Sequence, residues 1–267
     1  MTEKKTGYMK TFLRGLLPVL AFVFLFCSCE NVLDVDLAAI FQALPAVSDG
    51  SVHPETLPGS SEPSTVDTAA VLSGVPPFSG SPYAEVNGNV PFFNSADISE
   101  TSFEHYSALD IFGRCCTAFA NIGPELMPEE ERGPIGDIKP SGWHTVRYDF
   151  IDGHYLYNRC HLIGYQLTGE NANVRNLITG TRYLNISGML PFENRTADFI
   201  RRTGMHVLYR VTPIFDGYDL LASGVLIEAL SVEDGGSGLC FNVYCYNVQP
   251  GVDIDYATGD NSLSTSR

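Results

Sequence analysis

Residues 155–193 read YLYNRCHLIGYQLTGENANVRNLITGTRYLNISGMLPFE. Aromatic and apolar positions alternate with polar ones around its start, which predicts a β-strand over 154–163. A helix is predicted over 191–204, because Pro191 suits a first helical turn and Gly204 suits the residue after the last one. The stretch therefore predicts a strand and a helix joined by an asparagine-rich segment.

The flanking sequence extends this pattern in both directions. Segments rich in β-branched and aromatic residues, bounded by Gly, Asp and Pro, predict further strands, and these are 145–151, 206–215, 221–232 and 240–250. A second helix is predicted over 109–123. Strands, a helix and then more strands make an α+β arrangement.

The composition fits a folded protein, and its charge is unevenly distributed. The 267-residue chain is 44% hydrophobic and 11% aromatic, which excludes disorder throughout. Its formal net charge of −15 argues against a nucleic-acid partner, since that binding is driven by Lys and Arg displacing counterions. Seven acids in residues 131–210 are nevertheless outnumbered by ten cations: Arg132, Lys139, Arg147, Arg159, Arg175, Arg182, Arg195, Arg201, Arg202 and Arg210. A locally basic groove attracts phosphate even on an acidic protein.

The N-terminus has the pattern of an export signal. Basic residues precede the apolar run GLLPVLAFVFLF, which small and sulfur-bearing residues follow at once in CSCENV. This predicts a signal peptide over 1–29, because a membrane-spanning helix needs roughly 20 apolar residues. The stretch FCSC loosely resembles a bacterial lipoprotein box that ends at Cys29. The protein is thus expected outside a bacterial cell, either freely secreted or anchored to the membrane through lipid on Cys29.

A tether and one folded domain are expected after the leader. The segment 45–80 is dense in Pro, Ser, Gly, Thr and acids, and cannot bury enough apolar surface to fold. We therefore assign 30–80 to a tether and 81–267 to a single folded domain.

Five cysteines remain once Cys27 and Cys29 are assigned to the leader. Disulfides are permitted outside the cytoplasm, and Cys240 with Cys245, or Cys115 with Cys160, are two possible pairs. Spacing alone does not choose between them. The chain has no C-x-x-C pair, so a structural zinc site of the usual spacing is not expected.

The motif Asn158-Arg159-Cys160-His161 resembles the Asp-Arg-Gly-His motif of the bacterial DNA/RNA non-specific endonuclease family. It matches at Arg159 and His161 and departs at Asn158 and Cys160. The resemblance covers roughly residues 75–260, through stretches such as GPIGDIKPSGW, NLITGTRYLN and VLYRVTPIF.

This resemblance implies a fold and an activity. The fold is the ββα-metal (His-Me finger) nuclease core, in which helices flank a central antiparallel sheet. The activity is sugar-nonspecific hydrolysis of phosphodiester bonds in DNA, with RNA as an open second substrate, using one Mg²⁺ for which Mn²⁺ can substitute. The sequence has no element of the kinds that read base edges, so cutting is expected to be nonspecific. Oligomeric state is left open.

The resemblance also implies roles for six residues. His161 is the general base, Asn185 binds the metal, and Glu193 holds metal-bound water. Asn176 helps to position the metal or phosphate, and Arg159 and Arg182 contact the phosphate or the transition state. A charge at a helix N-terminus is the other interpretation of Glu193, and Arg182 could instead pair with an acid on a neighbouring element.

Elementary chemistry is consistent with these roles. A neutral histidine can accept a proton from water at working pH, Mg²⁺ prefers oxygen ligands and keeps several waters, and a guanidinium can grip two phosphoryl oxygens. One geometric condition follows. Eight residues of α-helix separate Asn185 from Glu193 by about 12 Å, so Glu193 reaches the site only if the backbone bends near Gly188 or Pro191.

Three alternatives remain at this point. The chain could be a catalytically inactive surface lipoprotein that binds a polymer or protein partner on a nuclease-like scaffold, as the net acidity and the altered motif would allow. It could be a metal-dependent phosphodiesterase or phosphatase for small substrates, or a toxin delivered to competing cells. The other five histidines are interpreted as structural, namely His53, His105, His144, His154 and His206.

Overall fold

The computed structural model describes residues 66–265. The predicted signal peptide over 1–29, including Cys29, and the tether up to residue 65 lie outside the described residues. Within 66–265, no helix is both long and apolar enough to cross a membrane.

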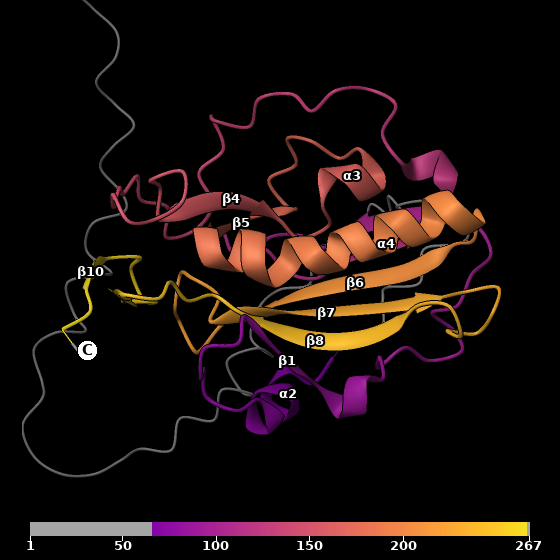
Figure 1. Cartoon of the computed structure of the whole chain (residues 1–267), viewed down its shortest axis with the longest axis horizontal. Helices are drawn as coiled ribbons and strands as arrows, with labels where there is room; N and C mark the ends of the chain where they lie inside the picture. Colours follow the sequence, from indigo (N-terminus) through magenta and orange to yellow (C-terminus); the bar gives the residue numbers. More distant parts are fainter. Residues whose placement is uncertain (1–65, 266–267) are drawn as a thin grey trace, which may run out of the picture. The chain divides into compact units, whose positions relative to one another are not determined.

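A six-stranded antiparallel sheet forms the centre of the fold (Figure 1). Its strands, in spatial order, are β1 (Tyr83–Glu85), β8 (Cys240–Tyr246), β7 (Gly224–Ser231), β6 (Val207–Ile214), β3 (Ala118–Ile122) and β2 (Phe103–Tyr106). The strands predicted over 206–215, 221–232 and 240–250 are confirmed as β6, β7 and β8.

A separate β-hairpin and the helix that follows it form a ββα unit. Strands β4 (Tyr157–His161) and β5 (Leu177–Thr181) pair antiparallel, with the short helix α3 (Tyr165–Thr168) between them. The π-helical segment η3 (Leu184–Met189) then continues directly into α4 (Leu190–Thr203). The predicted helix is confirmed, and Gly204 ends it with φ 70°. The α+β, ββα-metal fold class is therefore correct.

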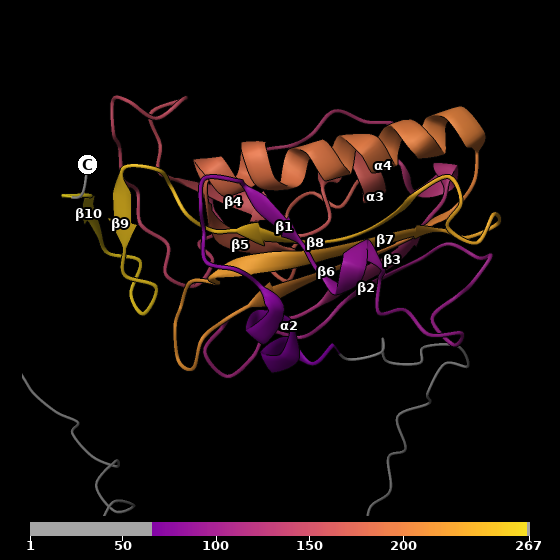
Figure 2. The same ribbon diagram turned by 60° about the horizontal axis from the view of Figure 1, so that its bottom comes forward.

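Successive side chains of a strand point to opposite faces of the sheet, so each face carries its own set of apolar side chains. Other elements pack over both of these faces. On β6, the odd-numbered Val207, Tyr209 and Val211 belong to the core cluster that also contains Phe199 and Ile200 of α4. Figure 2 shows α4 along this face and α2 (Thr68–Gly74) on the other. The remaining short elements are η1 (Asn87–Asn89), η2 (Pro124–Leu126), β9 (Val252–Ile254) and β10 (Asn261–Leu263).

Helix α2 corrects the expected end of the tether. It lies inside the range 30–80, yet Val71 is only 3% exposed and packs with Ile214, Leu226 and Tyr244. The side chain of Asp67 caps the helix by accepting hydrogen bonds from its first turn. A few apolar residues in a polar segment were thus enough to dock it on the sheet.

Two predicted elements are wrong. Residues 109–123 do not form a helix, because Ala118–Ile122 is strand β3, buried throughout between β2 and β6. A short apolar run of this kind cannot be distinguished from a buried helix by its periodicity. Residues 145–151 form a loop that ends in a turn instead of a strand, and only the isolated bridge between Arg147 and Tyr155 pairs there.

The five cysteines in the described part of the chain are all free thiols. Cys240 and Cys245 lie five residues apart on β8, so their side chains point to opposite faces of the sheet and cannot be bridged. Cys115 instead hydrogen-bonds through its thiol to the carbonyl groups of Val174 and Leu177.

Candidate active site

The ββα unit builds a pocket of about 360 Å³. The end of β4, the start of α3, segment η3 and the first turn of α4 contribute to its wall. Five of the six residues singled out in the sequence line it together: Arg159, His161, Arg182, Asn185 and Glu193. Arg132, from the loop after η2, completes its basic side.

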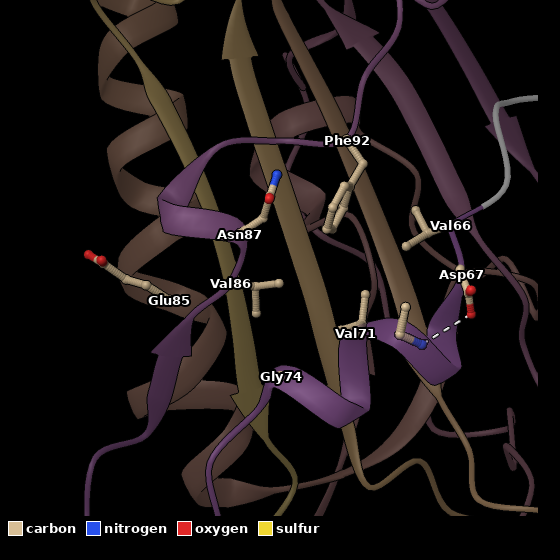
Figure 3. A pocket seen from close by; sticks show the side chains of 9 residues that line it. Val66, Asp67, Val71, Gly74, Glu85, Val86, Asn87 and Phe92 are labelled. Carbon is tan, nitrogen blue, oxygen red and sulfur yellow. Dashed lines mark hydrogen bonds between the residues drawn. The ribbon is translucent and has the colours of Figure 1, made fainter.

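A second pocket of about 390 Å³, between α2 and η1, has a different character. Figure 3 shows the apolar side chains of Val71, Val86 and Phe92 around it. The carboxylate of Asp67 is already used in capping α2. Titratable and hydrogen-bonding side chains instead gather in the pocket of the ββα unit.

His161 is held as a neutral imidazole at the end of β4. Its Nε2 donates to the carbonyl oxygen of Asn171 at 2.8 Å, and a carbonyl can only accept, so the proton resides on Nε2. Nδ1 keeps its lone pair and lies 3.4 Å from Nη2 of Arg132. Burial lowers the pKa of His161 to about 4, the Asn171 carbonyl opposes that shift, and the Arg132 charge adds to it. At neutral pH, Nδ1 is therefore unprotonated, and its lone pair accepts a hydrogen bond from Nη2 of Arg132.

Glu193 lies in the first turn of α4, against the backbone of Gly164. A Cβ atom at residue 164 would be 2.6 Å from the carboxylate oxygen Oε2, so only glycine leaves this space. Burial raises the pKa of Glu193 to about 7, while a hydrogen bond from Gln166 and the charge of Arg132 act to lower it. A carboxylate in the wall of a polar pocket is suited to interact with a cation or its bound water.

Glu193 should weaken the metal-free fold as pH rises. The pKa of Glu193 is about 7 in the folded protein and 4.5 ordinarily, so its ionisation destabilises the fold. Above pH 7 this lowers the free energy of unfolding by up to about 3 kcal/mol, and below pH 4.5 the effect disappears. Glu193→Gln removes that charge. We expect the variant's stability advantage over the unaltered protein to grow by about 1–3 kcal/mol between pH 5 and pH 8, measured by urea unfolding with a chelator present. An equal difference at both pH values would contradict this expectation.

The π-helical geometry of η3 brings Asn185 and Glu193 to one pocket. The N–H of Leu190 bonds to the carbonyl of Asn185, five residues earlier, instead of the four of an α-helix. Pro191 favours this departure, since it has no N–H and its ring would clash with the carbonyl four residues before it. The sequence required the backbone to depart from a regular α-helix near Gly188 or Pro191 for Glu193 to reach the site of Asn185. The wider π-helical turn is that departure.

Arg182 is held between two side chains. Its Nη2 lies 2.7 Å from Oδ2 of the exposed Asp152, and its Nη1 donates to Oδ1 of Asn158 at 3.3 Å. The pairing with a neighbouring acid that the sequence left open is therefore present. Arg182 also lines the pocket, so its guanidinium borders the same space as His161 and Asn185.

Arg159 lines the pocket, but its donors are engaged by backbone. Its guanidinium donates to the carbonyl groups of Ile138 and Gly136 and stacks 4.0 Å from the centre of the Trp143 ring. These contacts fasten the loop over 136–143 to β4. The geometry gives Arg159 a part in shaping the wall beside His161.

Asn176 is fully buried and does not line the pocket. Its Oδ1 accepts from the N–H of Ile163 at 2.9 Å, and its Nδ2 donates to the carbonyl of the same residue at 3.0 Å. These two bonds fix the backbone two residues after His161. This arrangement places Asn176 behind the pocket wall, where it holds the backbone next to His161.

Arg132 is the pocket residue that sequence reasoning missed. It lies beside Nδ1 of His161, and its charge acts on both His161 and Glu193. Its only signal in the sequence was membership of the basic stretch 131–210. It precedes the motif by more than 25 residues, in a loop with no pattern that predicts its approach.

The altered motif is accommodated by the neighbouring strand. Cys160 is completely buried, and a Cβ atom at Gly180 on β5 would lie 2.4 Å from its sulfur. The thiol thus occupies the space that Gly180 leaves empty. Asn158 keeps an acceptor oxygen, which is shared by Arg182 and Asn185.

The remaining histidines lie outside this pocket. His53 is not among the described residues, and His105, His144, His154 and His206 are absent from the pocket wall. His144 contacts the carbonyl of Thr258, and His206 pairs with Glu125 and Glu233.

The donor set fits a hydrated hard cation. In residues 66–265, no group of three or more His, Cys, Asp or Glu side chains is placed to enclose a metal ion. The pocket offers the amide of Asn185 and the carboxylate of Glu193, and Mg²⁺ needs few protein oxygens because it keeps several waters. A zinc site with several nitrogen or sulfur ligands does not match this composition.

Comparison with known proteins relates the chain to nucleases. A family model described as DNA/RNA non-specific endonuclease matches residues 94–233, more than half of the 267-residue chain. A deoxyribonuclease from Streptococcus dysgalactiae subsp. equisimilis is 32% identical over 110 residues. That match covers 39% of this chain and 32% of the relative, so the chain corresponds to about a third of the relative's length.

Solved structures show the same fold. The crystal structure of NucA from Streptococcus agalactiae with magnesium bound superposes with a TM-score of 0.60 at 28% identity, covering 67% of this chain and 87% of NucA. The metal-free NucA structure gives 0.62 at 27% identity, with coverage of 73% and 93%. The Sda1 nuclease with bound zinc gives 0.56 at 24% identity, with coverage of 69% and 97%, a likeness of fold.

Proposed function

The chain belongs to the DNA/RNA non-specific endonuclease family, and from this premise we propose that it is a metal-dependent endonuclease that hydrolyses phosphodiester bonds of DNA. One observation carries the proposal. The Nε2–H of His161 is fixed on a carbonyl, so that Nδ1 carries the lone pair and faces a pocket shared with Asn185, Glu193 and three arginines.

In the proposed mechanism, Nδ1 of His161 takes a proton from a water that attacks phosphorus. Arg132 and Arg182 stabilise the negative charge that develops on the phosphoryl oxygens, a role that suits fixed cations in a partly desolvated pocket. Asn176 and the Asn171 carbonyl keep the imidazole in place throughout.

Asn185 would hold the metal ion through its amide oxygen, and Glu193 would accept hydrogen bonds from metal-bound water. An ion held there would supply charge neutralisation at the phosphate and at the leaving oxygen. We propose a single Mg²⁺, with Mn²⁺ able to replace it. The magnesium-bound relative from Streptococcus agalactiae and the oxygen-rich donor set support this choice.

The proposed substrate is DNA, with RNA as the second substrate to test. Phosphate contacts carry no base information, and the pocket's cations are arginines suited to phosphate, so cleavage is expected at many sequences. The family's description and the streptococcal deoxyribonuclease support this class of substrate.

Export is proposed from the N-terminal pattern. The signal peptide over 1–29 would deliver the enzyme outside a bacterial cell, where it meets extracellular nucleic acid. Lipidation at Cys29 would anchor it, and the segment 30–65 would space the folded domain from the membrane. Mass spectrometry of the mature N-terminus distinguishes an acylated Cys29 from a free, cleaved chain.

We expect the purified protein to degrade supercoiled plasmid in the presence of Mg²⁺ and to stop when a chelator is added in excess. The reason is that a bound ion would neutralise charge at the phosphate and favour departure of the leaving alkoxide. Agarose gels over time provide the measurement, and a second addition of Mg²⁺ should restore cutting. Plasmid binding without cutting would favour the inactive scaffold, and cleavage of a small model diester alone would favour a small-substrate phosphodiesterase.

A further inference from the structure

Four side chains form a hydrogen-bonded row that reaches the pocket. Asp152 accepts from Nη2 of Arg182 at 2.7 Å, and Nη1 of Arg182 donates to Oδ1 of Asn158 at 3.3 Å. The same Oδ1 accepts from Nδ2 of Asn185, also at 3.3 Å. One amide oxygen of Asn158 thus links an arginine to the residue assigned to the metal.

The donor groups in this row determine which atom of each amide faces its neighbour. A guanidinium has only donors, so the atom of Asn158 that faces Arg182 must be its oxygen. That oxygen can only accept, so Asn185 must present its own NH₂ group to it. The Oδ1 of Asn185 is then left on the other side of its amide, as the atom free to meet a cation.

We propose that Arg182 and Asn158 are positioning residues for metal binding: Arg182 orients the amide of Asn158, which in turn orients Asn185 so that oxygen, and not NH₂, faces the ion. The inference rests on the proposed function, because it takes Asn185 as the ligand. An asparagine amide can turn by half a rotation at little steric cost, since its O and N are nearly equal in size. Presenting NH₂ to the cation would abolish ligation.

The asparagine at position 158 makes this orientation depend on Arg182. Where the family motif has aspartate, both side-chain oxygens are acceptors, and either can hold the NH₂ of Asn185 without help. Asn158 has one acceptor and one donor group, so a neighbour must select which of them faces Asn185. Only a residue without acceptors makes that selection unambiguous.

The proposal is tested by Mn²⁺ binding to the full chain without nucleic acid, followed by the electron paramagnetic resonance of free Mn²⁺. Arg182→Gln offers both a donor and an acceptor, so Asn158 can turn, and we expect the Mn²⁺ affinity to fall about 10-fold or more. In the Asn158→Asp background, Arg182→Gln should change the affinity by less than about twofold, because a carboxylate orients Asn185 alone.

Arg159→Gln is the matched control. It removes the same charge from the same pocket, but Arg159 donates to the backbone of Gly136 and Ile138 and takes no part in the row. Loss of a nearby cation by itself favours binding of a metal cation, so this variant should bind Mn²⁺ at least as tightly as the unaltered protein. Circular dichroism and thermal melting check that each variant is folded.

The possible results distinguish the orientation role of Arg182 from the metal-dependent function of the protein. An equal loss of affinity from Arg182→Gln in both backgrounds, or a similar loss from Arg159→Gln, would overturn the orientation role while leaving the proposed function intact. A folded, unaltered protein that binds no Mn²⁺ would overturn the metal-dependent function and this inference with it.

Discussion

Replacing His161 by alanine should lower the rate of plasmid cleavage by about 100- to 10,000-fold, the range associated with removing a positioned general base. The imidazole Nδ1 is the group placed to take the proton, and alanine has no atom that can replace it. The side-chain amide of Asn176 holds the backbone of Ile163 without involving the imidazole, so the fold should persist. Initial rates on plasmid at saturating Mg²⁺ provide the measurement.

His144→Ala is the matched control for His161→Ala. His144 contacts a backbone carbonyl as His161 does, but it lies outside the pocket, so the rate should stay within about twofold of the unaltered protein. A His161→Ala variant that keeps a tenth of the rate or more would remove His161 as the base.

The same assay has a pH signature. Because burial lowers the pKa of His161 to about 4, its basic form is lost only as pH falls toward that value. Protonation of His161 should therefore not reduce the rate between pH 8 and pH 5, whereas an exposed histidine of ordinary pKa would already be half charged near pH 6.5.

Replacing Arg132 by glutamine should lower kcat by about 100- to 1,000-fold, as expected when a fixed group that stabilises transition-state charge is removed. Arg132 lies beside Nδ1 of His161, so its guanidinium is close to the point of attack. The loss should appear mainly in kcat, because the charge it stabilises develops during the reaction. Steady-state kinetics on a short fluorescent duplex separate kcat from KM.

Arg175→Gln controls for the loss of one positive charge. Arg175 belongs to the same basic stretch but lies on the surface, outside the pocket. A change there should affect KM slightly and fade at higher salt, since a surface charge is screened. If Arg132→Gln behaves in the same way, Arg132 acts in general attraction of the substrate and has no part in the chemical step.

The altered motif does not argue for an inactive scaffold once its surroundings are known. Cys160 fits into the space above Gly180, and Asn158 retains the acceptor that its neighbours need. The net acidity is equally compatible with a nuclease, since Arg132, Arg159 and Arg182 converge on one pocket. These features keep catalysis as the first hypothesis and direct the tests to the pocket itself.

The sequence by itself determined the elements whose pattern is local. Strands β4, β6, β7 and β8 alternate apolar and polar side chains or carry dense β-branched residues, and α4 has its start and stop signals within its own length. The motif around His161 also depends only on adjacent residues. Such features are visible because hydrophobic period and capping act over a few residues.

Only the tertiary structure decided the rest. Strand β3 is a strand because β2 and β6 pair with it, α2 is ordered because the sheet offers an apolar surface, and Arg132 reaches His161 across a loop. Whether Asn185 and Glu193 share a pocket depended on the π-helical turn of η3, and Asn176 was revealed as a clamp on Ile163 by its burial. The physical reason is the same in all of these cases. Each feature is set by contacts between residues distant in sequence or by local backbone geometry. Neither of these two causes leaves a periodic pattern in the chain.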